Sequence, residues 1–174
     1  MQDTILSNIE AFSREIAAVK TSDDVLLGVK GLLVGSAFCL MKSHQLGFNA
    51  NVGSEYPNEL CSIPHEIAAG NLPEGGPWLA GFFFNSALMR IAAGYHILLK
   101  RMFGNTDESR KVLSKKAVDT GKIHPDDIDL LDKIYQDVND FKHEGGKLLR
   151  YRRIDRIEEA IAAGQKLISV FGLA

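Results

Sequence analysis

The longest apolar stretch of the chain spans residues 78–103, with the sequence WLAGFFFNSALMRIAAGYHILLKRMF. On a helix this stretch is hydrophobic on nearly every side, which is typical of the central helix of a bundle. Its apolar run is interrupted by Asn85, Ser86, Arg90 and His96, before Lys100 and Arg101 near its end. These interruptions argue against a membrane span. We therefore predict that residues 78–103 form the buried helix around which the others pack.

Two further helices are predicted before this stretch. Residues 5–19 carry one apolar stripe with a helical repeat. Residues 25–41 are predicted to form a buried helix rather than a membrane span, because Lys30 lies at the centre of this short run. Residues 21–24 are predicted to separate the first two helices and to cap the second one. Gly47 is predicted to end the second helix.

Three more helices are predicted after the central one. Thr106 is expected to cap a short basic helix that ends near Lys116. Pro125 fits the first turn of the next helix, where two acidic residues favour the positive end of the helix dipole. Gly145-Gly146 is expected to end that helix. The last helix is predicted to start near Asp155, in a pattern that resembles a capping box.

These patterns predict an all-α fold, an up-and-down bundle of about five main helices plus short ones, with no strand pattern of useful length. Residues 1–174 form a single helical domain, long enough to bury a core without disulfides. A long connection over residues 47–77 joins the second and third main helices and holds four of the five prolines. We interpret it as a loop and short-helix insertion, either functional or a plain surface excursion.

Charge and cysteine content narrow the class of protein and its compartment. The chain has 20 Lys and Arg against 22 Asp and Glu, so no overall field attracts it to nucleic acid or membrane. The N-terminus carries Asp3 where a secretory signal would carry a basic residue. We expect a cytoplasmic protein with no membrane partner. Cys39 and Cys61 are expected to be reduced thiols, one in the core and one in a loop.

Common cofactor and metal signatures are absent from the sequence. It has no phosphate-binding loop, no GxGxxG pattern and no HExxH pattern. Asp140 and His143 form its only Asp-x-x-His pair, and two ligands do not complete a metal site. We therefore expect neither a metal nor another cofactor.

The most informative polar pattern lies in residues 135–156. Asn139 and His143 are four positions apart, so both project from one face of a helix. A neutral histidine beside an amide can act as a general base or hold a phosphate. The alternative is a structural hydrogen-bonding pair at a helix end.

Charge along the chain is strongly segregated. Basic residues gather between positions 142 and 156, and these are Lys142, Lys147, Arg150, Arg152, Arg153 and Arg156. A second basic segment covers residues 100–116, and seven aspartates lie between the two, in residues 119–140. The basic segments either hold a phosphate backbone or pair with the aspartates, within the subunit or across a dimer.

Arg90 is the one charge in the middle of the central apolar stretch. A buried charge is costly unless it is paired, so one interpretation is a salt bridge or a side chain that reaches out along a groove. The other is an anion-binding group that points into the same cleft as Asn139 and His143.

Two stretches resemble the HEPN superfamily, the all-α domains named for nucleotide binding in higher eukaryotes and prokaryotes. One is the central helix FFFNSALMRIAAGYHILLK, and the other is VNDFKHE, followed by a basic loop and the helix IDRIEEAIAAGQKLISVF. Together they cover roughly half of the chain. The connection over residues 47–77 has no counterpart in this resemblance.

The resemblance implies a metal-independent RNase of a defence or toxin–antitoxin system, whose site forms where two subunits meet. His143 matches the histidine of the family's motif and Asn139 its polar residue. Val138 stands where the family has an arginine, whose charge would stabilise the transition state. Lys142 or Arg90 would have to replace that charge, and the family also contains inactive members.

Three functions stay open at this point, and the sequence does not decide whether the protein is an enzyme. The first is a HEPN-like RNA-associated protein, a weak or inactive RNase, that dimerises through the helix with Asn139 and His143 and has RNA and a cognate antitoxin or other protein as partners. The second is a non-catalytic homodimeric interaction domain. The third is a small-ligand-binding bundle in which residues 47–77 cover Trp78 and residues 82–84.

Overall fold

The computed structural model describes residues 3–48, 76–104, 106–143 and 154–171, and within these ranges the side chains of residues 76–78, 141–143 and 171 stay outside the description. The described residues form helices and no strands, which confirms the predicted all-α class. The helices are α1 (Thr4–Ala18), α2 (Asp24–Gln45), α4 (Gly76–Met102), α5 (Arg110–Asp119), α6 (Pro125–His143) and α7 (Ile157–Phe171).

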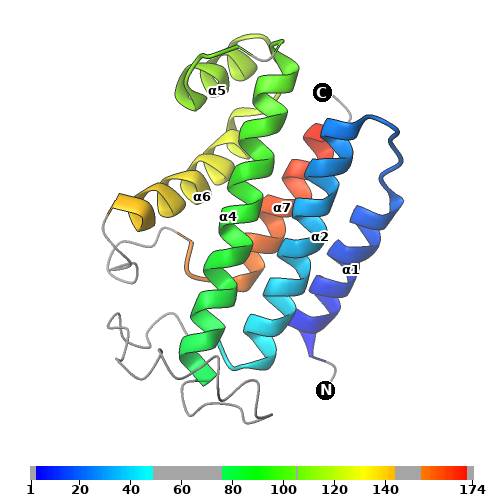
Figure 1. The fold of residues 1–174 in the computed structure, drawn as a ribbon, viewed down its shortest axis with the longest axis vertical. Coiled ribbons are helices and arrows are strands. Elements are labelled where there is room, and N and C mark those ends of the chain that lie inside the picture. Colours follow the sequence, from blue (N-terminus) through cyan, green and yellow to red (C-terminus); the bar gives the residue numbers. More distant parts are fainter. Residues whose placement is uncertain (1–2, 49–75, 105, 144–153, 172–174) are drawn as a thin grey trace.

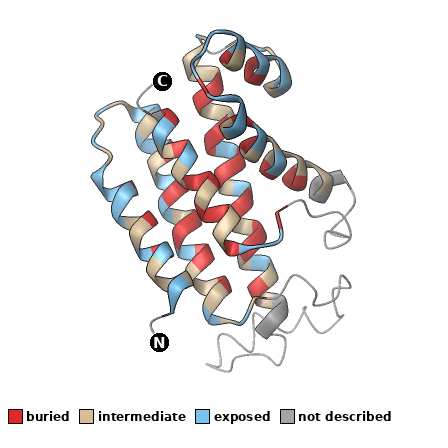
Figure 2. Ribbon diagram, turned by 180° about the vertical axis from the view of Figure 1, so that it is seen from behind, coloured by how far each residue is buried: buried red, intermediate tan, exposed pale blue. Residues whose placement is uncertain are grey.

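Helix α4 is the central element, as its apolar sequence predicts. It packs against α2, α5, α6 and α7, whereas α1 covers α2 and α7. In Figure 1, α1, α2, α4 and α7 run side by side, α6 crosses them at an angle, and α5 lies at the far end of α4. Figure 2 shows that buried residues concentrate along the middle of the bundle.

Helix limits follow the predicted local signals in most places. The Asp23 side chain caps α2 by accepting hydrogen bonds from the backbone N–H groups of Val25 and Leu26. Gly47 and Gly104 adopt positive φ angles of 74° and 81° just after α2 and α4. This conformation suits glycine and ends a helix.

The predicted cap of the short basic helix is wrong by three residues. Ser109, not Thr106, precedes the first residue of α5. The Thr106 hydroxyl instead donates to Glu108 Oε2 at 3.2 Å, and Glu108 pairs with Lys116 at 2.5 Å, so this turn is held by side chains before the helix begins. Helix α7 begins at Ile157, within two residues of the predicted start near Asp155. The predicted helix end at residues 145–146 and the short helical stretch within residues 47–77 fall outside the described residues.

The prediction that residues 25–41 form a buried helix is confirmed for one side of α2 only. Val29, Leu33 and Leu40 are buried, whereas Val34 and Phe38 are 54% and 55% exposed. By length and composition alone, α2 and residues 79–102 of α4 would suffice to cross a membrane, a test that core helices of soluble proteins also pass. Cys39 lies buried as a free thiol, and Cys61 is outside the described residues.

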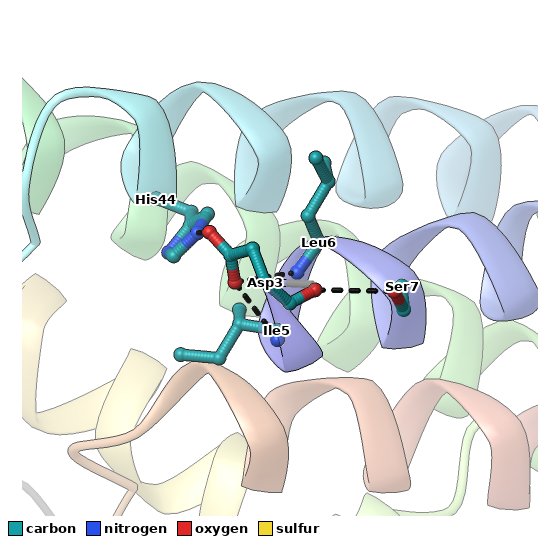
Figure 3. Close-up of polar contacts among 5 residues, drawn as sticks. All are labelled: Asp3, Ile5, Leu6, Ser7 and His44. Atoms are coloured by element: carbon teal, nitrogen blue, oxygen red, sulfur yellow. Dashed lines mark hydrogen bonds and ion pairs between the residues drawn. The ribbon is translucent and has the colours of Figure 1, made fainter. Parts of the chain in front are cut away.

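Helix α1 is fastened to α2 at both of its ends. At its N-terminus, Asp3 accepts hydrogen bonds from the backbone N–H groups of Ile5 and Leu6 and lies 2.5 Å from His44 Nε2 (Figure 3). At its C-terminus, Lys30 Nζ donates to the carbonyl oxygen of Val19 at 2.7 Å. The bond to His44 holds the pKa of Asp3 below its usual value.

Close packing of α1 on α7 depends on Gly164. A Cβ added at this position would lie 2.3 Å from Cζ of the fully buried Phe12. We predict that Gly164→Ala lowers the free energy of unfolding by about 1–3 kcal/mol, because the Phe12 ring has to shift in a packed core. Urea unfolding measures this effect. Gly28→Ala is the control, since nothing lies within 4 Å of its added Cβ and alanine favours the helix by about 1 kcal/mol. Equal effects of the two substitutions would contradict the prediction.

The lowered pKa of Asp3 predicts a specific pH dependence. The ionised carboxylate stabilises the folded state above the unfolded pKa, and this contribution is lost as the pH falls through the lower folded pKa. Asp3→Asn keeps a capping oxygen and removes the charge. We therefore expect the variant to be less stable than wild type at pH 5, with the difference vanishing toward pH 2 in urea unfolding. A difference that stays constant over this range would show that the charge is not responsible.

Candidate functional site

A cleft of about 470 Å³ opens between α4 and α6. It is lined by Met89, Ala92, Ala93, His96, Ile97, Lys100, Tyr135, Val138 and Asn139. The crossing angle of α6 over α4 brings together these two stretches, which are far apart in the sequence (Figure 1). Of the predicted catalytic pair, Asn139 lies in this cleft.

Four polar side chains line the cleft in two matched pairs. His96 and Lys100 are four residues apart on α4, and Tyr135 and Asn139 are four residues apart on α6. This spacing places each pair on one side of its helix, one turn apart. The His96 and Tyr135 rings lie across the cleft from each other, with centroids 6.1 Å apart and planes tilted by 56°. A cation, an imidazole, a phenol and an amide therefore share one open cavity.

The rest of the cleft wall is apolar. Ala92 and Val138 are buried, and Met89 and Ile97 complete the wall. Apolar walls with a few convergent polar groups are typical of sites for small molecules and cofactors. Val138, which stands where the HEPN resemblance would place an arginine, is only 7% exposed and lines the cleft as part of this apolar wall.

Arg90 lies against α2 rather than in the cleft. Its Nη1 donates to the carbonyl oxygen of Ser86 at 3.0 Å, and its Nε lies 2.7 Å from where a Cβ on Gly35 would be. The absence of a side chain at Gly35 makes room for the guanidinium in the contact between the two helices. This placement agrees with the interpretation of a side chain held along a groove, and it separates Arg90 from Asn139.

The remaining predicted site residues fall outside the description. Helix α6 reaches His143, but the side chains of His143 and Lys142 are among those not described. The same holds for the predicted phosphate-binding residues Lys147, Arg150, Arg152 and Arg153. Their roles stay predictions.

A network of hydrogen bonds and an ion pair holds the α6 wall of the cleft. The Tyr95 hydroxyl lies 2.8 Å from Ser114 Oγ and 3.1 Å from Asp132 Oδ1, and Asp132 also pairs with Arg110. The Arg110 guanidinium in turn lies 4.5 Å from the centroid of the Tyr135 ring. Burial raises the pKa of Tyr95 well above its usual value, so its hydroxyl stays protonated.

The aspartates of α6 are used mainly for internal pairing. Arg110 of α5 pairs with Asp132, and Lys166 of α7 lies 2.8 Å from Asp127. The buried Asp137 accepts a hydrogen bond of 2.7 Å from the backbone N–H of Ile154, which fixes the chain just before α7. Of the basic segment at residues 100–116, Lys100 is the residue that lines the cleft.

Sequence reasoning identified Asn139 but missed most of its neighbours. The sequence gives no reason to single out Tyr135, and it places Lys100 only in the basic segment of residues 100–116. The available signal was the spacing of His96 and Lys100 in an otherwise apolar helix, which indicates one partly polar side. That this side meets α6 depends on tertiary packing.

Comparison of the chain with known protein families, with curated proteins and with solved structures finds no match. The resemblance to the HEPN superfamily therefore rests on the residues of this sequence alone.

The network behind Tyr135 predicts a measurable loss of stability. Asp132→Asn keeps an oxygen for Tyr95 and removes the charge that pairs with Arg110, which is only 14% exposed. We expect the free energy of unfolding to fall by about 1–3 kcal/mol, because Arg110 loses a charged partner. Asp129→Asn is the matched control, since Asp129 is exposed on the same helix. Chemical unfolding compares the two variants, and similar losses for both would refute the role of the pair.

Proposed function

We propose that the protein is a HEPN-like RNA-associated protein that binds a nucleotide unit of single-stranded RNA in the cleft between α4 and α6. The observation that carries this proposal is the meeting of Lys100, His96, Tyr135 and Asn139 in one cleft. The resemblance of residues 138–144 to the HEPN motif supports the same helix as the RNA-binding element.

Each polar group of the cleft has a role in nucleotide binding. Lys100 supplies a cation for a phosphate, and the rings of His96 and Tyr135 offer flat surfaces for a base. The Asn139 amide carries donors and an acceptor for a base edge or a ribose hydroxyl. This combination suits unstacked RNA, whose bases are free to enter a cleft.

Binding without efficient cleavage is the activity that we propose. An RNase of this family would need a positive charge beside its histidine, but Val138 takes the arginine position. Of the two possible substitutes, Arg90 packs on α2, and the side chain of Lys142 lies outside the described residues. No arginine is among the residues that line the cleft in the described structure. A cytoplasmic defence or toxin–antitoxin role, with a protein partner, belongs to the same proposal.

Binding of a fluorescent single-stranded RNA, measured by anisotropy at several salt concentrations, tests this function. We expect Lys100→Ala to weaken binding about tenfold, because it removes one phosphate contact. The slope of log binding constant against log salt concentration should become shallower by about 1. Asn139→Ala should weaken binding without changing the salt dependence. The control is Lys20→Ala, which removes an exposed lysine outside the cleft.

Three results would overturn the proposal. Wild-type protein that does not bind RNA, or equal losses for Lys100→Ala and Lys20→Ala, would exclude the cleft as an RNA site. Metal-independent cleavage of the RNA that His143→Ala abolishes would show instead that the protein is an active nuclease.

A further inference from the structure

The outward side of α2 carries an apolar stripe that the described chain leaves exposed. Leu27, Val34 and Phe38 are 45%, 54% and 55% exposed, and Gly31 is exposed between them. The intervals of four, three and four residues match the seam by which one helix packs along another. A Cβ added at Gly31 would meet nothing within 4 Å, so this position has room for a side chain of a partner.

Charge is arranged so that the stripe itself is neutral. Lys30 lies within this length of helix, but its Nζ is bonded to the carbonyl oxygens of Val19 and Ala17 of α1 and its adjoining turn, at 2.7 and 3.4 Å. The next charges are Asp24 at one end of α2 and Lys42 at the other, where Lys42 Nζ lies 5.8 Å from the centroid of the Phe38 ring. They are separated by five helical turns, so they lie on the same flank of the stripe.

This pattern is complementary to itself when one copy is reversed. In an antiparallel pair of identical helices related by a two-fold axis, the same flank of each helix meets. Asp24 then lies opposite Lys42 of the partner subunit, at both ends of the contact. Leu27 lies opposite Phe38 of the partner subunit, and the small Gly31 lies opposite Val34 of the partner subunit.

We propose that the α2 stripe is the interface of a homodimer in which two copies of α2 pack antiparallel. One acid and one base at opposite ends of α2 fit a second, reversed copy better than a membrane surface, which attracts faces rich in basic residues. The outer side of α6 is less suited to self-association. Among the described residues, its exposed side chains include Asp126, Asp129 and Lys133 and no large apolar one.

The first experiment measures the oligomeric state of the full chain by sedimentation velocity over a range of concentrations. Wild type should be a dimer, and Val34→Glu should raise the dimer dissociation constant at least 100-fold, since two carboxylates would be buried without partners. Val112→Glu is the matched control, because Val112 is 43% exposed on α5. A monomeric wild type, or equal effects of the two substitutions, would overturn the proposal.

A charge exchange tests the antiparallel arrangement. Asp24→Lys and Lys42→Asp should each raise the dissociation constant about tenfold, because each places like charges at both ends of the contact. The double variant should return it to within about threefold of wild type. Thermal unfolding checks that all variants fold. Failure of the double variant to recover would exclude this antiparallel pairing, whereas a monomeric wild type would point to another cover of the stripe, such as a membrane. The outcome does not depend on RNA binding.

Discussion

The packing of helices around α4 is the constraint on which the rest of the structure depends. Because α4 is apolar on several sides, α2, α6 and α7 all bury their own apolar stripes against it. Gly94 lets α4 pack closely against two neighbours, because a Cβ at this position would lie 3.1 Å from Leu167 and 3.4 Å from Val29. Among the described side chains of α4, one strip is left partly uncovered, and this strip carries His96 and Lys100. The position of the cleft is therefore a consequence of how the core is filled.

Local sequence signals were sufficient for most helix limits, because caps and stops act within a few residues. Asp23, Gly47 and Pro125 each stand where the sequence predicted a start or an end. The start of α5 was misplaced because Thr106 bonds to Glu108, and a threonine that can cap a helix can equally close a turn. The exposed side of α2 was not foreseen, since apolar residues around a helix do not show which element covers them.

The candidate site was predictable only in part, for a related reason. The spacing of Asn139 and His143 identifies a polar side of α6 from sequence alone. That this side faces Lys100 and His96 depends on the crossing of two helices that lie far apart in the chain. Arg90 shows the same limit. Its sequence context indicates a charge that needs a partner, but only the space at Gly35 decides that it turns toward α2.

The two proposed surfaces rely on different physical forces, which keeps them separable. The affinity of Lys100 for a phosphate falls as salt concentration rises, because the release of bound counterions then gains less entropy. Burial of Leu27, Val34 and Phe38 between two copies of α2 is driven by the hydrophobic effect, which salt does not weaken in this way. High salt should therefore release RNA while the subunits stay together. A site shared by two copies of α6, as the HEPN resemblance implies, would instead link RNA binding to dimerisation at every salt concentration.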